Sequence, residues 1–242
     1  MKEIIINIVS NIIVAILTFI ATKLYFGYKN FKGIKGAARL NKDCFTGGII
    51  NIFPNRKAYA QHKDHGTSSE YVLKADHDMI YVGYWLASGT ELGNLKKSIK
   101  VLVSKKKTVT LVFMNPYNNQ SLTICSKYIG VSAQSIKSRI LQVLKDLIEL
   151  KSTLHDNSRY LIIKVHDVPL ATSAFLLDTN EITNCRILLD YKLYNGSRED
   201  SYGIEFENKE KDITNKVFKS YMSIEEGSTE IHSLADLHST KV

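Results

Sequence analysis

The residues of this chain that could do chemistry are few. Arg56 follows the first predicted strand, and a guanidinium there suits a phosphate oxygen. Ser88 and Thr90 belong to a Ser-Gly-Thr turn between a predicted strand and a predicted helix, where backbone N–H groups and the helix dipole favour an anion. Tyr84 lies just before that turn. These residues predict a phosphate or nucleotide contact, and the alternatives are an ordinary strand–helix turn and a solvated loop charge.

His166 stands beside Asp167 at a predicted strand end, which suggests acid–base chemistry. Adjacent residues on a strand point to opposite faces, so these two do not form a dyad by themselves. The other histidines are scattered, and no zinc spacing is present. Cys44, Cys125 and Cys185 are odd in number and have no metal-like spacing. We interpret them as reduced thiols and expect neither a metal nor a cofactor.

The strands and helices of the fold determine where these candidate site residues lie. Apolar runs bounded by turn residues predict strands, and residues with helical spacing predict helices. The predicted strands are 47–54, 79–87, 109–114, 161–166, 174–177, 187–189 and 202–206, the last as an edge strand, and the predicted helices are 69–75, 90–103, 132–154 and 213–222. Residues 57–67 are predicted to be a loop, and the tail from Gly227 to be polar and loose. Alternating strands and helices favour an α/β sandwich with a mixed sheet.

Within this pattern, residues 161–206 resemble the phospholipase D superfamily, whose members carry His-x-Lys-x4-Asp after a strand. The frame here reads Ala171-x-Ser173-x4-Asp178, after the strand 161–165 and a turn at Val168-Pro169. The order of earlier strands and the closing helix are also similar, so the resemblance covers about residues 46 to 222. A single unit behind an N-terminal hydrophobic segment resembles the one-motif bacterial members, which pair two chains to complete a site.

The resemblance implies that the usual phosphodiesterase chemistry is lost. The family's nucleophile is the histidine, and an alanine methyl at position 171 cannot attack phosphorus. Ser173 replaces the lysine that holds phosphate, and only Asp178 matches. Such degenerate members resemble binding or oligomerising domains. Asp178 is then a ligand contact or, in the alternative interpretation, a turn or capping residue.

The first hydrophobic run, residues 4–22, has no charged residue and is long enough to span a bilayer as a helix. The alternative is a cleaved signal peptide, but the run exceeds a usual signal core and Lys2 is offset by Glu3. Basic residues follow the run, which places the C-terminal domain in the cytoplasm of a single-pass inner-membrane protein.

One face of this segment is polar or small. Its residues recur at helical spacing, and buried Asn side chains in lipid are costly unless they bond to another helix. We therefore expect self-association into a homo-oligomer. The alternative is that the two Asn side chains lie at the wet interface. The stripe consists of Asn7, Asn11, Ala15, Thr18 and Thr22.

The net charge of +8 is confined to one segment. Residues 23–63 hold nine Lys or Arg and one acid, and the other 201 residues hold 23 basic and 23 acidic side chains. A basic stretch beside a predicted membrane segment suits anionic lipid headgroups better than a DNA-binding face. We expect lipid contact and regard nucleic acid as an unlikely partner.

These observations predict four regions: a transmembrane anchor (1–28), a basic juxtamembrane linker (29–45), a cytosolic phospholipase D-like domain (46–225) and a polar tail (226–242). The leading hypothesis is a non-catalytic sensor or effector that binds a phosphate-bearing ligand, such as a nucleotide, and drives association of the anchor helix, in bacterial stress or phage defence. The alternatives are a membrane-tethered phosphodiesterase, nuclease or lipid hydrolase that uses a displaced His166, and a protein-interaction scaffold.

Overall fold

The computed structural model describes residues 43, 46–63, 65–84, 90–170, 172–194 and 201–239. The chain divides into two units, Met1–Thr46 and Gly47–Val242, and the fold described below is that of the second. The predicted anchor, its polar stripe and, apart from Asp43, the basic linker lie outside the described residues. Within the described part of the chain, none of the helices has the length and apolar character needed to cross a bilayer.

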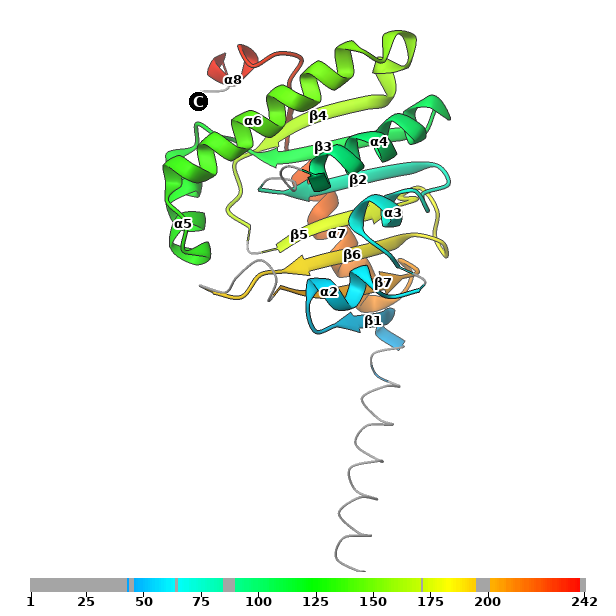
Figure 1. Ribbon diagram of the computed structural model, residues 1–242. Coiled ribbons are helices and arrows are strands. Elements are labelled where there is room, and N and C mark those ends of the chain that lie inside the picture. Colours follow the sequence, from blue (N-terminus) through cyan, green and yellow to red (C-terminus); the bar gives the residue numbers. More distant parts are fainter. Residues whose placement is uncertain are drawn as a thin grey trace, which may run out of the picture. The chain divides into compact units, whose positions relative to one another are not determined.

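Eight strands form one mixed sheet with the order β1-β7-β6-β5-β2-β3-β4-β8 (Figure 1). β2, β3 and β4 are mutually parallel, and β5 and β7 run antiparallel to their neighbours. The strands are β1 (Ile49–Phe53), β2 (Asp78–Gly83), β3 (Thr108–Met114), β4 (Leu161–His166), β5 (Thr172–Leu177), β6 (Arg186–Tyr191), β7 (Tyr202–Glu207) and β8 (Thr229–Glu230).

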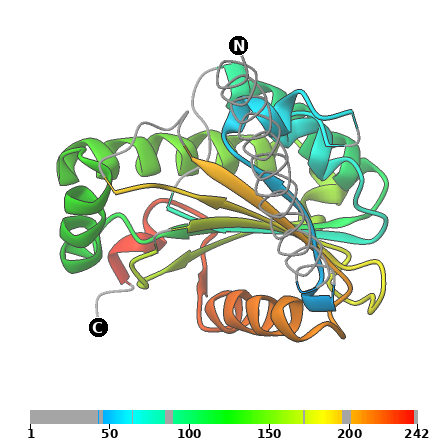
Figure 2. The same cartoon turned by 90° about the horizontal axis from the view of Figure 1, so that it is seen from below.

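Helices cover both faces of the sheet, which confirms the predicted α/β sandwich. Figure 2 shows α7 on one face and the longer helix α6 on the other. The helices are α2 (Arg56–Ala60), α3 (Ser68–Val72), α4 (Thr90–Ser104), α5 (Asn119–Ile129), α6 (Ala133–Ser152), the 3₁₀ helix η1 (His155–Tyr160), α7 (Asp212–Glu226) and α8 (Asp236–Ser239).

The core is divided by the sheet into two apolar layers. The larger layer packs α4 and α6 against the sheet, and Ile140, Leu144 and Leu147 of α6 are fully buried there. The smaller layer packs α7 against the opposite face, where Phe206 of β7 and Tyr221 of α7 are buried. Burial on both faces explains the nearly continuous apolar runs of β2 and β3.

Two sequence predictions were wrong in this unit, and one helix was missed. Part of the predicted loop at 57–67 is the helix α2, which begins because the side chain of Asn55 accepts a hydrogen bond from the Ala58 N–H at 2.9 Å. The helix α5 was not predicted at all, although Asn118 caps its start and Gly130 ends it in the left-handed conformation. β7 is not an edge strand, because β1 pairs with its outer side.

The C-terminal tail is also more ordered than predicted. β8 pairs with β4 through Lys164 and Val165, and it is followed by the short helix α8. Ile231 and Leu237 have no exposed surface, because they pack into the larger apolar layer. Together with the partly buried Leu234, these apolar residues dock the segment onto the sheet edge.

Candidate functional site

The carboxyl ends of the parallel strands lie along one edge of the sheet, called here the carboxyl edge. Because β5 and β7 run antiparallel, their first residues lie at this edge too. One cross-strand row faces the larger apolar layer: Phe53 is paired with Gly203, Gly203 with Asp190, and Asp190 with Ser173. Gly83 comes next to Ser173. At the carboxyl edge, this row thus places the polar side chains of Asp190 and Ser173 next to the apolar core.

Two glycines in this row make room for tyrosine side chains, Tyr59 from α2 and Tyr81 from β2. A Cβ atom on Gly203 would lie 3.2 Å from the Tyr59 ring, and one on Gly83 would collide with the hydroxyl oxygen of Tyr81. Both tyrosines are buried. The carboxyl edge is therefore packed with phenol groups, and a larger side chain at either glycine would collide with one of them.

Arg56 is held over this row by two partners. Its Nε donates a hydrogen bond of 2.6 Å to the Tyr59 hydroxyl, and its Nη2 lies 3.7 Å from Oδ2 of Asp190. Burial has the largest single effect and would lower the pKa of Arg56, but the charges of Asp190, Tyr59 and Glu91 and the hydrogen bond to Tyr59 together raise the pKa, so the guanidinium stays charged. Burial raises the pKa of Tyr59 to about 12, so its hydroxyl is neutral.

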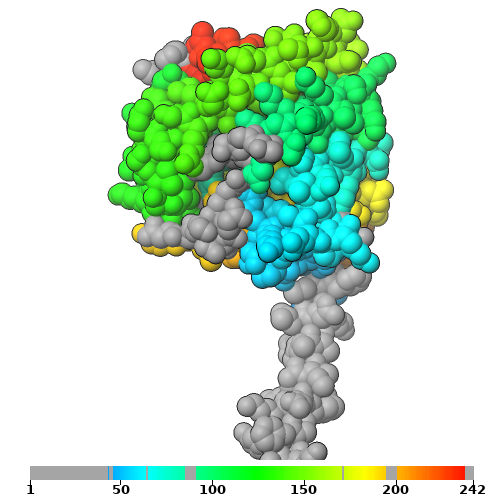
Figure 3. All heavy atoms as spheres, in the orientation of Figure 1, coloured from blue at the N-terminus to red at the C-terminus, as the bar shows by residue number. Residues whose placement is uncertain are grey.

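The Arg56 guanidinium also borders a surface hollow of about 280 Å³, called here the Arg56 hollow. Lys57 supplies a second positive charge, and Glu91 supplies one negative charge from the first turn of α4. Figure 3 shows the face of the molecule that α2 and α3 (cyan) help to form. The hollow is lined by Arg56, Lys57, Tyr59, Ala60, Thr67, Ser68 and Glu91.

Tyr84 lies at the same edge but inside the protein, with 1% of its surface exposed. Burial raises the pKa of its phenol, and the ammonium group of Lys192 lies 5.0 Å from its ring centre. Tyr84 is therefore part of the buried core at the carboxyl edge and does not line the Arg56 hollow. Thr90 is the first residue of α4, but its side chain and the whole of Ser88 lie outside the described residues.

His166 ends β4, and both of its ring nitrogens have partners. The N–H of Val168 donates to Nδ1 at 3.2 Å, and Nε2 lies 3.2 Å from the carbonyl oxygen of Gly83. Since a backbone N–H can only donate, Nδ1 is the acceptor and Nε2 carries the proton. Burial lowers the pKa of this ring. The neutral His166 ring thus links the end of β4 to the end of β2. Its one ring lone pair already accepts a hydrogen bond, so it cannot act as a general base.

The burial of two histidine rings, His166 and His65, predicts that the free energy of unfolding falls in mild acid. Burial lowers the pKa of both His166 and His65, so the unfolded chain binds more protons than the folded one. The free energy of unfolding should be highest above about pH 6.5 and fall below it, by at most about 1.4 kcal/mol per pH unit for each ring. Urea titrations at several pH values measure this slope. His166→Gln should flatten it, and an unchanged slope in His166→Gln would contradict the assignment.

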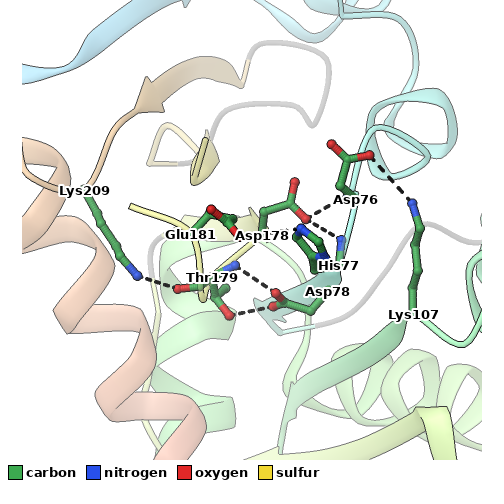
Figure 4. A network of polar contacts seen from close by, with 8 residues as sticks. All are labelled: Asp76, His77, Asp78, Lys107, Asp178, Thr179, Glu181 and Lys209. Carbon is green, nitrogen blue, oxygen red and sulfur yellow. Dashed lines mark hydrogen bonds and ion pairs between the residues drawn. The ribbon is translucent and has the colours of Figure 1, made fainter. Parts of the chain in front are cut away.

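Ser173 and Asp178 lie at opposite ends of β5. Ser173 belongs to the row at the carboxyl edge, whereas Asp178 follows the last residue of the strand. Oδ1 of Asp178 accepts hydrogen bonds from the backbone N–H groups of Asp76 and His77 at 2.8 and 2.7 Å. Figure 4 shows this arrangement at the amino end of β2. Asp178 therefore does not lie beside Arg56, and the alternative interpretation of a capping residue fits its contacts. A ligand contact at Asp178 stays a prediction.

Asp78 makes the reciprocal contacts at the same end of the sheet. Its carboxylate accepts from the Thr179 N–H at 3.0 Å and from the Thr179 hydroxyl at 2.6 Å, and its carbonyl oxygen accepts from the N–H of Asp178. The ammonium group of Lys209 donates to the Thr179 carbonyl at 2.7 Å. This network, called here the aspartate clasp, joins the start of β2 to the end of β5 (Figure 4).

The structure therefore brings together four predicted residues at the carboxyl edge: Arg56, Tyr84, His166 and Ser173. Sequence reasoning missed Asp190 and Tyr59, which hold Arg56. The signal for Asp190 was present, since an acidic residue interrupts the apolar run of β6. Among the residues that the structure describes, no group of three or more His, Cys, Asp or Glu side chains is placed to hold a metal ion.

Comparisons with known proteins agree in part with the sequence resemblance. No protein-family model matches the chain, and no curated protein matches it. Among solved structures, phosphatidylserine synthase of Haemophilus influenzae Rd KW20 matches with a TM-score of 0.48 and 13% identity, over 67% of this chain and 36% of that one. The chain thus spans about a third of that synthase.

Two further structures are similar over more of their length. Nuc, a phospholipase D family member from Salmonella typhimurium, matches with a TM-score of 0.40 and 8% identity, over 68% of this chain and 88% of that one. TrmBL2, an archaeal chromatin protein with a novel mode of DNA binding, matches with a TM-score of 0.43 and 8% identity, over 88% and 69%. A phospholipase D family member is thus among the structures similar to this chain, as the sequence predicted. At these identities, no activity is transferred.

Proposed function

We propose that this chain is a non-catalytic binding protein with a phospholipase D-like domain, in which the Arg56 hollow takes a phosphate-bearing ligand. The observation that carries this proposal is the way Arg56 is held. Tyr59 and Asp190 fix a charged guanidinium at the border of the hollow, and Lys57 adds a second positive charge. A guanidinium fixed before the ligand arrives loses less entropy on binding a phosphate.

Three features support binding without hydrolysis. Position 171 is alanine in the sequence, so the family's nucleophile is missing. Ser173 is 6% exposed and has no imidazole among its cross-strand neighbours, which are Asp190 and Gly83. His166, the displaced candidate, uses both ring nitrogens in hydrogen bonds to the backbone. Neither position 171 nor His166 therefore offers a free ring nitrogen to carry a phosphoryl intermediate.

The proposal is tested by titrating the full chain, in detergent, with inorganic phosphate in a calorimeter. Arg56→Gln removes the charge-assisted hydrogen bonds and should weaken binding about tenfold or more. Arg159→Gln is the matched control, because Arg159 lies on η1 and its guanidinium contacts its neighbour Tyr160. If the two variants bind phosphate equally well, Arg56 is not the phosphate contact.

We further propose that residues 4–22 anchor the chain in the inner membrane, with the described domain on the cytoplasmic side, and that the polar stripe pairs anchor helices. Single cysteines placed through residues 7–22 should crosslink with a helical period, strongest at the stripe. Asn11→Leu should reduce crosslinking, because it removes a hydrogen-bonding side chain. Crosslinking without periodicity would rule out a packed stripe. A role in stress or phage defence predicts that expression lowers membrane potential, and that Asn11→Leu restores it.

A further inference from the structure

His65 lies in the turn between α2 and α3, and its ring is completely buried. The ring is stacked on that of Tyr71, with the ring centres 4.5 Å apart. The rings of Phe53 and Tyr59 lie 5.0 and 5.2 Å from it. These four rings, called here the His65 cluster, join α2 and α3 to β1 and bury a titratable group between them.

The two ring nitrogens of His65 have different surroundings. Nδ1 lies 2.8 Å from the Gly66 carbonyl oxygen, which can only accept, so Nδ1 carries the proton of the neutral ring. Nε2 is buried and has no hydrogen-bond partner in the described part of the chain. Protonation would add an N–H at Nε2 that faces no acceptor there, and a buried donor without an acceptor is unfavourable. The closed His65 cluster therefore fits the neutral ring and disfavours the charged one.

The charged groups around the ring do not reverse this preference. Burial has the largest effect and lowers the pKa of His65, and Lys74 and His62 lower it further, whereas the Gly66 hydrogen bond and Glu205 raise it. The Glu205 carboxylate already accepts a hydrogen bond of 2.7 Å from the Asn51 side chain. Burial raises the pKa of the two phenols, so they stay neutral. The titratable groups that face the ring are Tyr59 from α2, His62 from the turn, Tyr71 from α3, Lys74 just after α3 and Glu205 from β7.

The His65 cluster and the Arg56 hollow are built from the same two helices. Tyr59 contacts the His65 ring and also lines the hollow. Thr67 and Ser68 follow His65 closely in the chain and line the hollow from the start of α3. Because α2 and α3 have only five residues each, their stability depends mainly on side-chain packing. Loss of the packing around His65 would therefore disrupt the hollow.

We propose that His65 is a pH switch for the Arg56 hollow: protonation of its ring releases α2 and α3 from the sheet, and the chain then loses its phosphate-bearing ligand. This inference rests on the proposed function, because it concerns the ligand of that same hollow. Once released, the ring titrates near its ordinary pKa of about 6.5. The closed form is therefore favoured above about pH 6.5 and loses stability as the pH falls from there toward the lowered pKa of the closed form.

Hydrogen–deuterium exchange of the full chain in detergent, without ligand, measures this opening. After correction for the intrinsic pH dependence of exchange, the opening constant of α2 and α3 should rise several-fold, up to about tenfold, between pH 7.5 and 5.5. The helix α6 reports global unfolding and should stay protected. His65→Phe keeps an aromatic ring in the stack but cannot take up a proton, so the rise should disappear. His232→Phe makes the same change at an exposed ring and should keep the rise.

Calorimetry with inorganic phosphate at pH 7.5 and 5.5 measures the coupling to the ligand. Inorganic phosphate itself titrates in this range, so the loss of affinity in the parent chain is compared with the loss in His65→Phe. The parent chain should lose several-fold more affinity, up to about tenfold, because the binding-competent fraction falls. His232→Phe should behave like the parent chain. Equal losses in the parent chain and His65→Phe would overturn the coupling.

The two measurements separate the switch from the proposed function. If acid does not increase exchange in α2 and α3 of the parent chain beyond that in α6, the switch is wrong, even where a variant fails to fold. Failure of inorganic phosphate to bind the parent chain at pH 7.5 would overturn the proposed function. The exchange measurement, made without ligand, would then still decide whether His65 controls the opening of the two helices.

Discussion

Replacing Asp178 with alanine is expected to lower the free energy of unfolding by about 3 kcal/mol. The side chain accepts hydrogen bonds from two backbone N–H groups, those of Asp76 and His77, and the substitution leaves both without this acceptor. Asp178 also has a φ of 55°, which aspartate and asparagine tolerate better than alanine. Urea unfolding of the detergent-solubilised protein, followed by intrinsic fluorescence, measures the loss.

Asn at position 178 is the matched control. Its side-chain oxygen can still accept from both N–H groups, and its backbone still adopts a positive φ, so most of the stability should remain. Neither substitution should change phosphate binding by the folded protein, because the aspartate clasp lies at the opposite end of β5 from Arg56. A stable Asp178→Ala variant that binds phosphate poorly would show that Asp178 belongs to the ligand site after all.

Gly83→Ala is the second change with a large expected effect. The new Cβ would collide with the Tyr81 hydroxyl oxygen and lie 2.7 Å from Cβ of Ser173, and both neighbours are buried. The Gly83 carbonyl also anchors His166. Overpacking of this kind should cost about 1–3 kcal/mol, and urea unfolding measures it.

Gly93→Ala makes the same chemical change at a place with open space. A Cβ there meets no heavy atom within 4 Å, and Gly93 lies in α4. Alanine should therefore stabilise the helix, by up to about 1 kcal/mol. Opposite signs for the two substitutions are the expected result. If Gly83→Ala were neutral, the close packing of the two tyrosines over the glycine row would be in doubt.

The sequence predicted the sheet better than its surroundings. Long apolar runs such as 109–114 are buried on both faces, so composition alone identified them as strands. The helix α6 has six buried residues at helical spacing, and its prediction at 132–154 is close to the observed bounds. The helix α2 was not predicted because five residues are too few to show a periodic pattern, and its start depends on a single cap, Asn55.

The candidate site was harder to predict because its contacts join distant strands. Arg56 was singled out for its position after a strand, but its partner Asp190 is far away in sequence and is brought close only by the order β1-β7-β6. The sequence grouped Asp178 with Arg56, although the two lie at opposite edges of the sheet, for a related reason. The spacing of a motif along one strand does not show that two of its residues, here Ser173 and Asp178, lie at opposite edges of the sheet.

The central claim is that the carboxyl edge binds phosphate esters through Arg56 and does not hydrolyse them. Phosphorus-31 NMR of the full chain in detergent tests both parts in one sample, with glycerol 3-phosphate and a phosphodiester such as bis(4-nitrophenyl) phosphate as probes. We expect the glycerol 3-phosphate resonance to broaden or shift with the parent chain and with Arg159→Gln but not with Arg56→Gln, and no product resonance to grow. A product resonance that grows with the parent chain and is lost in His166→Gln would contradict the account.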